Sequence, residues 1–183
     1  MLSILIPAYQ EPKIREFMEQ IEYDIIPNQI IVCNDRYGKG KGWALREALK
    51  EATGNRIVFI DGDGDIQPYE INKLITYMYQ YDIVVGKKQL PGSLNRKVLT
   101  YLSRLYILAL FGLTIDTQTG IKAFNYKPEW KTDGWAFDIE ILYKAKKDGK
   151  SMIEVPIKAI VSDTKNLGDI LKTLWESLKI RFQ

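Results

Sequence analysis

Short apolar runs alternate with amphipathic segments through the first half of the chain. The runs have the length and composition of β-strands, and strands are predicted at residues 2–6, 29–33, 56–60 and 83–86. Between them, apolar residues recur three and four positions apart, which predicts helices over residues 14–21, 44–52 and 71–78. This alternation favours an α/β fold, with a mostly parallel central sheet and helices on both of its faces.

The second half of the chain is less regular. It predicts a long helix, a short strand, a second helix and a further strand at residues 95–111, 121–124, 136–147 and 152–160. Pro156 interrupts the last strand, which indicates an edge position or a bulge, because proline has no N–H for the ladder. Residues 166–182 have the pattern of an amphipathic helix, whose apolar side comprises Leu167, Ile170, Leu171, Leu174, Trp175 and Leu178.

Composition narrows the classes of function. The chain has 183 residues, enough for one domain with its own core, and no repeat or low-complexity linker divides it. It has no histidine, which excludes Ser-His-Asp catalysis and histidine-ligated metals, and its single cysteine, Cys33, excludes an internal disulfide. Any metal ion would therefore bind oxygen ligands, which favours Mg²⁺ or Mn²⁺. With no secretory signal and no apolar run of membrane-spanning length, we expect the protein in the cytoplasm.

Three alternating carboxylates, those of Asp61, Asp63 and Asp65, follow the apolar strand at 56–60. Ligands of parallel sheets bind beyond the carboxyl ends of the strands, so these side chains are expected in the binding crevice. Like charges this close repel unless a cation compensates them, which predicts a divalent metal site that also holds a substrate diphosphate. A solvated acidic turn is the alternative.

A glycine-rich, cationic loop from Gly38 to Gly42 leads into the second predicted helix. Its spacing fits neither a Walker loop nor a dinucleotide-binding loop. Because backbone N–H groups at a helix N-terminus attract anions, Lys41 and Gly42 are candidates for contact with a phosphate group. An ordinary exposed loop is the alternative.

Charge is unevenly distributed along the chain. The formal net charge of +3 is too small to favour nucleic-acid binding. The stretch between Asp82 and Asp116 has no acidic residue but carries five lysines and arginines. Within it, Arg96, Thr100 and Arg104 recur every four residues along one face of the predicted helix, where they form a candidate phosphate site. A solvated basic face is the alternative.

Seven motifs, in this order, resemble those of family 2 glycosyltransferases with the GT-A fold, in particular the dolichyl-phosphate mannose synthases and related polyprenyl-phosphate glycosyltransferases. The motifs are LIPAYQE (5–11), IIVCND (30–35), GKGWAL (40–45), DGDGD (61–65), DTQTGIKAF (116–124), WAFDIEIL (135–142) and EVPI (154–157). The resemblance implies a Rossmann-like GT-A catalytic domain over residues 1–165, with residues 166–183 as the amphipathic C-terminal helix of the same domain.

The resemblance also implies roles for individual residues. The residues expected to bind the donor, a GDP- or UDP-linked sugar, are Pro7, Tyr9, Glu11, Asp35, Lys41, Gly42 and Asp61. Those expected to bind Mg²⁺ or Mn²⁺ are Asp61, Asp63 and Asp65, and those expected to hold the acceptor phosphate are Arg96, Thr100 and Arg104. Asp63, Asp138 and Arg96 are the expected catalytic residues.

The implied reaction is inverting, metal-dependent transfer of a hexose, such as mannose or glucose, to a polyprenyl (dolichyl) phosphate. A phosphate acceptor is already ionised near pH 7, which fits a chain without histidine. If the acceptor were a hydroxyl, Asp138 would be the candidate base; otherwise it positions the donor or begins a helix. Residues 105–115 and the C-terminal helix would contact the inner face of the membrane peripherally, with core packing as the alternative.

Three other functions fit parts of the pattern. A family 2 enzyme could act on a sugar hydroxyl or another soluble acceptor, and a nucleotidyltransferase also uses strand-end carboxylates with a divalent ion. A non-catalytic, basic binding module is the third. The three carboxylates at 61–65 argue against this last function, because an inactive relative has no need of them.

Overall fold

The computed structural model describes residues 1–8, 11–88, 94–160 and 167–182, and it describes only the backbone of residues 94–97, 99 and 167–171. Strands and helices follow one another in the predicted order. The strands are β1 (Leu2–Pro7), β2 (Gln29–Cys33), β3 (Arg56–Ile60), β4 (Ile83–Lys88), β5 (Ile121–Phe124) and β6 (Met152–Ile157). The helices are α1 (Ile14–Ile25), α2 (Lys41–Glu51), α3 (Glu70–Tyr77), α4 (Leu94–Phe111), α5 (Phe137–Lys147) and α6 (Leu167–Arg181).

The described strands form one six-stranded sheet in the order β2-β1-β3-β5-β4-β6. β5 runs antiparallel to both of its neighbours, and the other adjacent pairs are parallel. The mostly parallel sheet is therefore confirmed, with one reversed strand that the hydrophobic pattern does not reveal. Pro156 lies in β6 at the edge of the sheet, where the missing N–H is tolerated.

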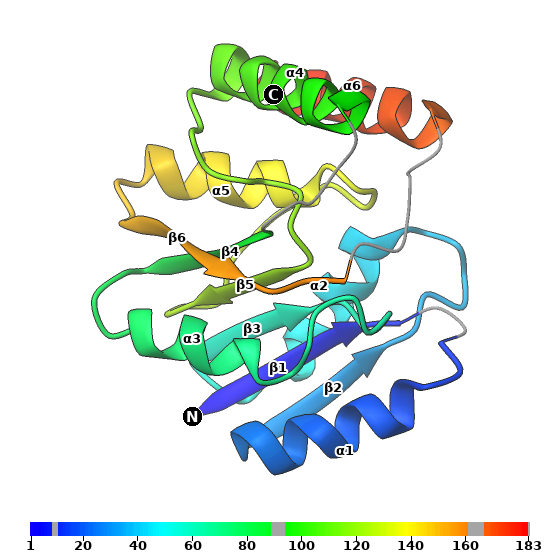
Figure 1. The fold of residues 1–183 in the computed structure, drawn as a ribbon, viewed down its shortest axis with the longest axis vertical. Coiled ribbons are helices and arrows are strands. Elements are labelled where there is room, and N and C mark those ends of the chain that lie inside the picture. The colour runs from blue at the N-terminus through cyan, green and yellow to red at the C-terminus, as the bar shows by residue number, and fades with distance from the viewer. Residues whose placement is uncertain (9–10, 89–93, 161–166, 183) are drawn as a thin grey trace.

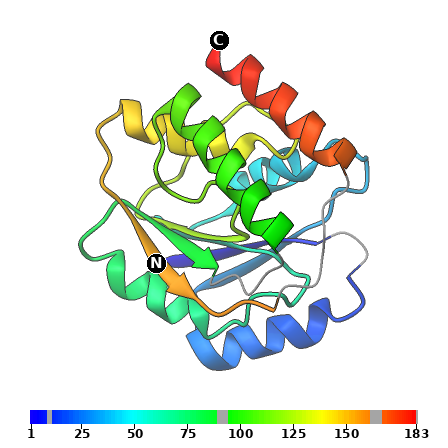
Figure 2. The same cartoon turned by 45° about the horizontal axis from the view of Figure 1, so that its top comes forward.

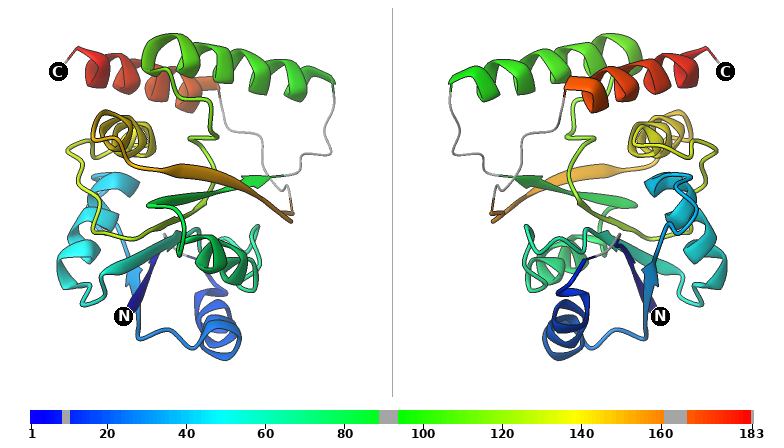
Figure 3. Two further views of the ribbon diagram at one scale, coloured as in Figure 1. Left: turned by 90° about the vertical axis from the view of Figure 1, so that its left-hand side faces the viewer. Right: turned by 90° about the vertical axis from the view of Figure 1, so that its right-hand side faces the viewer.

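Helices cover both faces of the sheet (Figure 1). One face packs against α1 and α3, whose side chains Phe17 and Leu74 are part of the core on that side. The other face packs against α2 and α5, which contribute Leu45 and Leu142. α4 and α6 form a further layer outside α5, which Figure 2 shows obliquely and Figure 3 shows from the side. No helix in the described part of the chain is long and apolar enough to cross a membrane.

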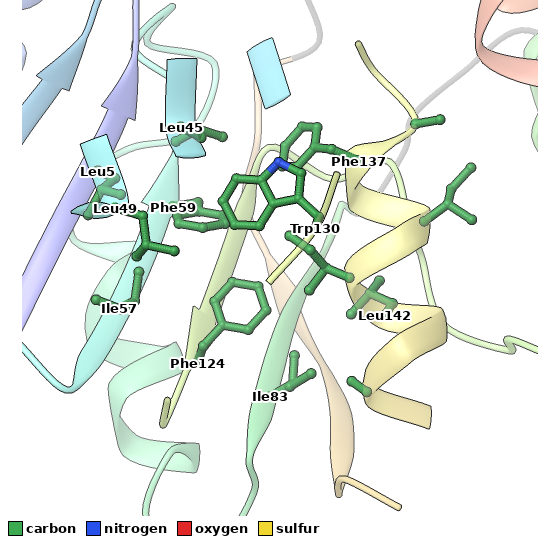
Figure 4. Close-up of a cluster of buried hydrophobic side chains, with 14 of the residues drawn as sticks. Leu5, Leu45, Leu49, Ile57, Phe59, Ile83, Phe124, Trp130, Phe137 and Leu142 are labelled. Atoms are coloured by element: carbon green, nitrogen blue, oxygen red, sulfur yellow. The ribbon is translucent and has the colours of Figure 1, made fainter. Parts of the chain in front are cut away.

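Aromatic side chains fill the core between the sheet and α5 (Figure 4). The ring of Phe59 lies 5.1 Å from that of Phe124 and 5.9 Å from that of Trp130, measured between centroids. Trp130 also packs on Phe137 and donates its indole N–H to the carbonyl of Gly42 at 3.0 Å. This cluster therefore holds the segment before α5 against the start of α2.

The C-terminal helix α6 is amphipathic as predicted, but its buried side differs from the predicted one. Ser177 and Ile180 are buried, whereas Trp175 is 62% exposed. The hydroxyl of Ser177 lies 2.9 Å from that of Tyr106 in α4. Side chains two positions apart in a helix point about 200° away from each other. Because Ser177 faces Tyr106, Trp175 therefore faces outward. Of the other predicted positions, Leu174 and Leu178 are half-buried, and the side chains of Leu167, Ile170 and Leu171 lie outside the described part of the chain.

Candidate active site

The predicted site residues that follow strands lie together at the carboxyl ends of the parallel strands, and we call this side the site edge of the sheet. Pro7 is the last residue of β1, Asp35 follows β2 by two residues and Asp61 follows β3 directly. The backbone N–H of Asp61 donates to the carbonyl of Gly120 at 2.9 Å, because the reversed strand β5 begins at this same edge. The parallel topology thus delivers three chain segments, and β5 a fourth, to one crevice.

The electrostatics of Asp63 and Glu11 indicate that carboxylates gather beside this edge. Burial raises the pKa of Asp63, and the charges of Asp61 and Asp65 add to the shift, although the backbone N–H of Asp65 and the Lys88 ammonium oppose it. Burial also raises the pKa of Glu11, and Asp63 and Asp61 contribute to that shift as well. Such shifts are typical of like charges in a functional cleft.

The chemistry of this cluster fits a divalent cation. Carboxylate oxygens are the ligands that Mg²⁺ and Mn²⁺ prefer, and a positive ion would relieve the repulsion that raises the pKa of Asp63. Within the described residues, however, no group of three or more acidic, cysteine or histidine side chains is arranged to hold a metal. Protein donors already engage the predicted ligands: Lys41 binds Asp61, the backbone N–H of Asp65 binds Asp63 at 3.0 Å, and the ammonium of Lys88 lies 3.9 Å from Asp65. The metal ligands Asp61, Asp63 and Asp65 thus stay a prediction.

Lys41 is half-buried in this crevice. It begins α2, and its ammonium lies 2.5 Å from Oδ1 of Asp61, with the lysine side chain only 14% exposed. Burial acts to lower the pKa of Lys41, but the carboxylates of Asp61 and Asp138 outweigh it and the pKa is raised. Gly38 and Lys39 are exposed, whereas Lys41 belongs to α2, and contact of this loop with a phosphate group stays a prediction. A fixed positive charge beside Asp61 suits contact with an anionic ligand.

A second buried ion pair lies next to the first, and the sequence pattern identified only one of its members. The ammonium of Lys122, in β5, lies 2.8 Å from Oδ1 of Asp138 and 2.6 Å from the carbonyl of Thr119. Burial raises the pKa of Asp138, against the opposing charges of Lys122 and Lys41. Lys122 is not among the predicted site residues. The signal that could have revealed it is a lone lysine within an apolar strand, since a buried ammonium needs a partner.

Asp35 closes a turn and does not present a free carboxylate. Its oxygens accept hydrogen bonds from the backbone N–H groups of Lys39 at 2.9 Å and Gly40 at 2.6 Å. Burial acts to raise the pKa of Asp35, but these and two neighbouring N–H groups outweigh it and the pKa is lowered. The observed role of Asp35 is to fold the loop onto the start of α2, and its contact with the donor stays a prediction.

A cavity of about 300 Å³ lies between this loop, the segment before α5 and helix α6. Its walls include Lys39, Gly40, Trp135 and Glu176. A side chain at Gly42 would collide with the backbone carbonyl of Thr132, so glycine lets α2 begin against that segment. Gly42 thus has a packing role, and its contact with phosphate stays a prediction.

The predicted acceptor residues lie on α4. Thr100 is half-buried, and the guanidinium of Arg104 lies 3.4 Å from Oδ2 of Asp116. Arg96 belongs to the same helix, but its side chain lies outside the described part of the chain, as does the whole of Tyr9. The observed helix confirms the spacing of the three residues. Their contact with a phosphate is untested.

The end of β4 brings further positive charge to the site edge. Lys87 pairs with Oε2 of Glu154 at 2.7 Å, and the ammonium of Lys88 lies 3.9 Å from Oδ2 of Asp65. The other oxygen of Glu154 accepts the backbone N–H of Asp116 at 2.5 Å. Glu154 therefore links the edge strand β6 to the segment that precedes β5.

Comparisons with known proteins agree with this arrangement. Residues 13–98 match the model of a family described as glycosyl transferase family 2. An undecaprenyl-phosphate mannosyltransferase of Micrococcus luteus is 25% identical over 174 residues, which cover 79% of this chain and 70% of that protein. A dolichyl-phosphate beta-glucosyltransferase of Homo sapiens is 27% identical over 167 residues, which cover 78% of this chain and 49% of that protein. The chain thus spans between about half and 70% of the length of these two relatives.

Solved structures share the fold over the whole chain. Glucosyl-3-phosphoglycerate synthase from Mycobacterium tuberculosis, in complex with Mn²⁺ and UDP-glucose, matches with a TM-score of 0.80 at 16% sequence identity, covering 100% of this chain and 79% of that chain. At this identity the likeness concerns the fold alone. Together, the family model, the polyprenyl-phosphate relatives and the shared architecture show that this chain is similar to proteins of glycosyl transferase family 2 and has the GT-A fold.

Proposed function

We propose that the chain catalyses inverting, metal-dependent transfer of a hexosyl group from a nucleotide sugar to a polyprenyl phosphate. The observation that carries the proposal is the carboxylate cluster after β3, with the buried ammonium of Lys41 beside it. The relatives named as polyprenyl-phosphate mannosyl- and glucosyltransferases support this choice of reaction.

On the donor side, the diphosphate of the nucleotide sugar binds where the carboxylates and Lys41 meet. Asp61, Asp63 and Asp65 would hold Mg²⁺ or Mn²⁺, which when bound neutralises the charge that develops on the leaving diphosphate. Lys41 supplies a further positive charge at the same place. Asp35, which follows β2, would contact the nucleoside.

On the acceptor side, α4 presents an apolar stripe to solvent. Its side chains, 45–66% exposed, are Val98, Tyr101, Leu102, Leu105 and Leu108. Because they are three and four positions apart, they lie on one face of the helix. A continuous exposed apolar face is costly in water and suits the acyl boundary of a membrane, where a prenyl chain resides. This stripe supports a lipid acceptor over a soluble one.

Basic side chains accompany the stripe. Arg104 lies on α4 itself, and the neighbouring α6 carries Lys179, whose ammonium lies 5.6 Å from the ring centre of the exposed Trp175. Such residues suit anionic headgroups and the phosphate of a lipid acceptor. We assign the acceptor phosphate to Arg96, Thr100 and Arg104, and the protein to peripheral contact with the inner face of the membrane.

The chemistry needs little proton transfer. An oxygen of the acceptor phosphate attacks the anomeric carbon from the face opposite the diphosphate, and the bond from that carbon to the diphosphate oxygen breaks, which inverts the configuration. The acceptor is already ionised near pH 7, since the second pKa of a phosphate monoester is about 6. Asp138, buried and paired with Lys122, therefore positions the donor and does not act as a base.

The test is a matrix of donors, metals and acceptors. The purified chain is incubated with UDP- and GDP-linked glucose and mannose, with Mg²⁺ or Mn²⁺, and with either dolichyl phosphate or undecaprenyl phosphate in detergent. 3-Phosphoglycerate serves as the soluble phosphorylated acceptor. We expect a glycolipid product that disappears on chelation of the metal. Transfer to the soluble acceptor alone would refute the lipid acceptor. In a separate reaction with a nucleoside triphosphate and a hexose 1-phosphate, formation of a nucleotide sugar with release of pyrophosphate would indicate a nucleotidyltransferase.

A further inference from the structure

A small cavity beside the carboxylates is lined by Thr119, a residue whose buried hydroxyl has no partner among the described residues. Thr119 is 2% exposed, and its Oγ1 makes no hydrogen bond within the described part of the chain. The cavity has a volume of about 10 Å³, and its polar wall consists of Thr119, Lys41, Asp61, Lys122 and Asp138. An unsatisfied buried hydroxyl is uncommon in folded proteins and calls for an explanation.

The size and charge of the cavity define what can occupy it. A volume of this order holds about one water molecule or one hydroxyl group. The charges around it are balanced, because Lys41 pairs with Asp61 at 2.5 Å and Lys122 with Asp138 at 2.8 Å. An additional ion would find no uncompensated partner, and an apolar group would leave the hydroxyl of Thr119 unsatisfied. A neutral hydroxyl group satisfies the wall, because it both donates and accepts.

The cavity adjoins the carboxylate cluster without an intervening side chain. Gly120 lines the cavity, and a Cβ atom at this position would collide with the carboxylate of Asp61. Asp61 itself belongs both to the cavity wall and to the cluster that raises the pKa of Asp63. A ligand whose diphosphate lies at the cluster would therefore have its sugar next to the cavity.

We infer that this cavity is a subsite for one hydroxyl group of the donor hexose, with Thr119 as a residue that determines donor specificity. The inference rests on the proposed function, because it takes the ligand at the carboxylates to be a nucleotide sugar. The hydroxyl of Thr119 and the carboxylate of Asp138 supply the donor and the acceptor that such a group requires. A site built to bond a hydroxyl rejects the sugar that lacks it, since its own polar groups are then left unpaired. A resident water is the other source of the same chemistry.

The experiment is a double-mutant cycle between the protein and the donor. Thr119→Val removes the hydroxyl and keeps the shape, and kcat/KM is measured with the preferred nucleotide hexose and with its 2-, 3-, 4- and 6-deoxy analogues. We expect the variant to lose roughly 10- to 100-fold in kcat/KM with the parent sugar. With one of the deoxy analogues, kcat/KM of the wild-type protein should be lower than with the parent sugar by a similar factor. In the variant, kcat/KM should be the same for this analogue and for the parent sugar. The other analogues should show the same penalty in both proteins.

Two further variants complete the design. Thr119→Ser should retain activity toward the parent sugar. Thermal unfolding shows whether Thr119→Val is folded, and Thr119→Ala is used in its place if it is not. Thr117→Val is the matched control, because Thr117 is 4% exposed on the same segment but is not part of the cavity wall. It should leave the ratios among the donors unchanged.

The possible outcomes separate this inference from the proposed function. If every deoxy penalty is the same in the Thr119→Val variant and in the wild-type protein, the cavity holds a resident water and the inference is wrong. If the wild-type chain neither binds nor uses any nucleotide sugar, the proposed function fails and the inference falls with it.

Discussion

At the scale of single residues, the charge on Asp63 provides the most direct test of the proposed metal dependence. Asp63→Asn removes one negative charge from a cluster whose mutual repulsion raises the pKa of this carboxyl. We expect metal-stimulated transfer to fall by roughly 100-fold or more. Initial rates across a Mn²⁺ titration measure the effect. Asp24→Asn, at an exposed position on α1, is the control and should retain full activity. Equal metal-stimulated rates in the two variants would contradict the assignment.

Ile26 is a site of local backbone strain. It ends α1 with φ 52° and ψ 58°, although it is β-branched and precedes Pro27, and its side chain is 83% exposed. Ile26→Asn should raise the free energy of unfolding by roughly 0.5–1 kcal/mol, because asparagine tolerates left-handed geometry. Urea denaturation would show a higher midpoint at an unchanged slope. Tyr23→Asn, earlier on the same helix, should not stabilise the protein, and a loss of stability in Ile26→Asn would refute the strain.

Residues of this site differ in how far the sequence reveals them. Asp61, Asp63 and Asp65 are recognisable because they follow one apolar strand within five positions. Lys122 and Thr119 are not recognisable in the sequence. The role of Lys122 depends on its pairing with Asp138, and that of Thr119 on a cavity that forms only when β5 lies antiparallel between β3 and β4. A local sequence pattern identifies residues that act together with their neighbours in the chain. It does not identify residues whose partners come from distant segments.

At the scale of elements, Glu140 connects the first turn of α5 to the segment before it. Its buried carboxylate accepts the backbone N–H groups of Lys131 at 2.9 Å and Thr132 at 2.8 Å. Burial acts to raise the pKa of Glu140, but these donors and Lys144 outweigh it, so the pKa lies below its ordinary value of 4.5. A carboxyl with a lowered pKa stabilises the fold above its unfolded pKa and loses that contribution as the pH falls through the folded pKa.

Glu140→Gln should therefore destabilise the protein in a pH-dependent way. At pH about 7 the loss should be roughly 1–3 kcal/mol, the typical contribution of hydrogen bonds to a charged group. The difference in free energy of unfolding between the wild-type protein and the variant should decrease as the pH falls below 4.5. Urea denaturation at several pH values provides the measurement, with Glu22→Gln on the exposed face of α1 as control. A difference that stays constant with pH would show that ionisation has no part in the contact.

The apolar stripe of α4 predicts membrane affinity. Replacing Leu102 and Leu105, which are 55% and 49% exposed, by aspartate removes apolar contact and adds charge that anionic lipids repel. Binding to phosphatidylglycerol vesicles should weaken by roughly 10-fold or more. Sedimentation with the vesicles measures it. Tyr23→Asp, at an 86% exposed position of α1, should bind as the wild type does. Unchanged binding of the α4 variant would refute the membrane role.

At the scale of the whole molecule, ligand binding at the site edge should stabilise the entire fold. Nucleoside diphosphate with Mg²⁺ or Mn²⁺ should raise the free energy of unfolding by roughly 3–4 kcal/mol at saturating concentrations of 100 to 1,000 Kd. Either component alone should raise the free energy of unfolding less. Without the cation the carboxylates repel the diphosphate, and without the diphosphate the cation lacks part of its oxygen ligands. Thermal unfolding tests this without any acceptor. An equal shift with and without metal would contradict a shared site.

The architecture is predictable from the sequence to the level of element order and the two faces of the sheet. The alternation of strand-length runs and amphipathic segments is sufficient, since right-handed crossovers leave few other topologies. The layer of α4 and α6 outside α5 is not predictable in this way. The contact between Tyr106 and Ser177 that joins these two helices at 2.9 Å depends on residues far apart in the chain, and it is this contact that places Trp175 outward.

The reversal of β5 has a consequence for how the chain folds. β1, β2 and β3 can assemble as synthesis proceeds, because β2 and β3 each pair with β1, which is already made, and only the contact of β3 with β5 forms later. β5 must then enter between β3 and β4, and β6 completes the sheet by pairing with β4. The pairings of β3 with β5 and of β4 with β6 join strands that are far apart in the sequence, and forming them costs loop-closure entropy. Insertion of β5 should therefore govern the folding rate. The step that sets the folding rate would thus also be the one that assembles the crevice beyond the ends of β1, β2 and β3.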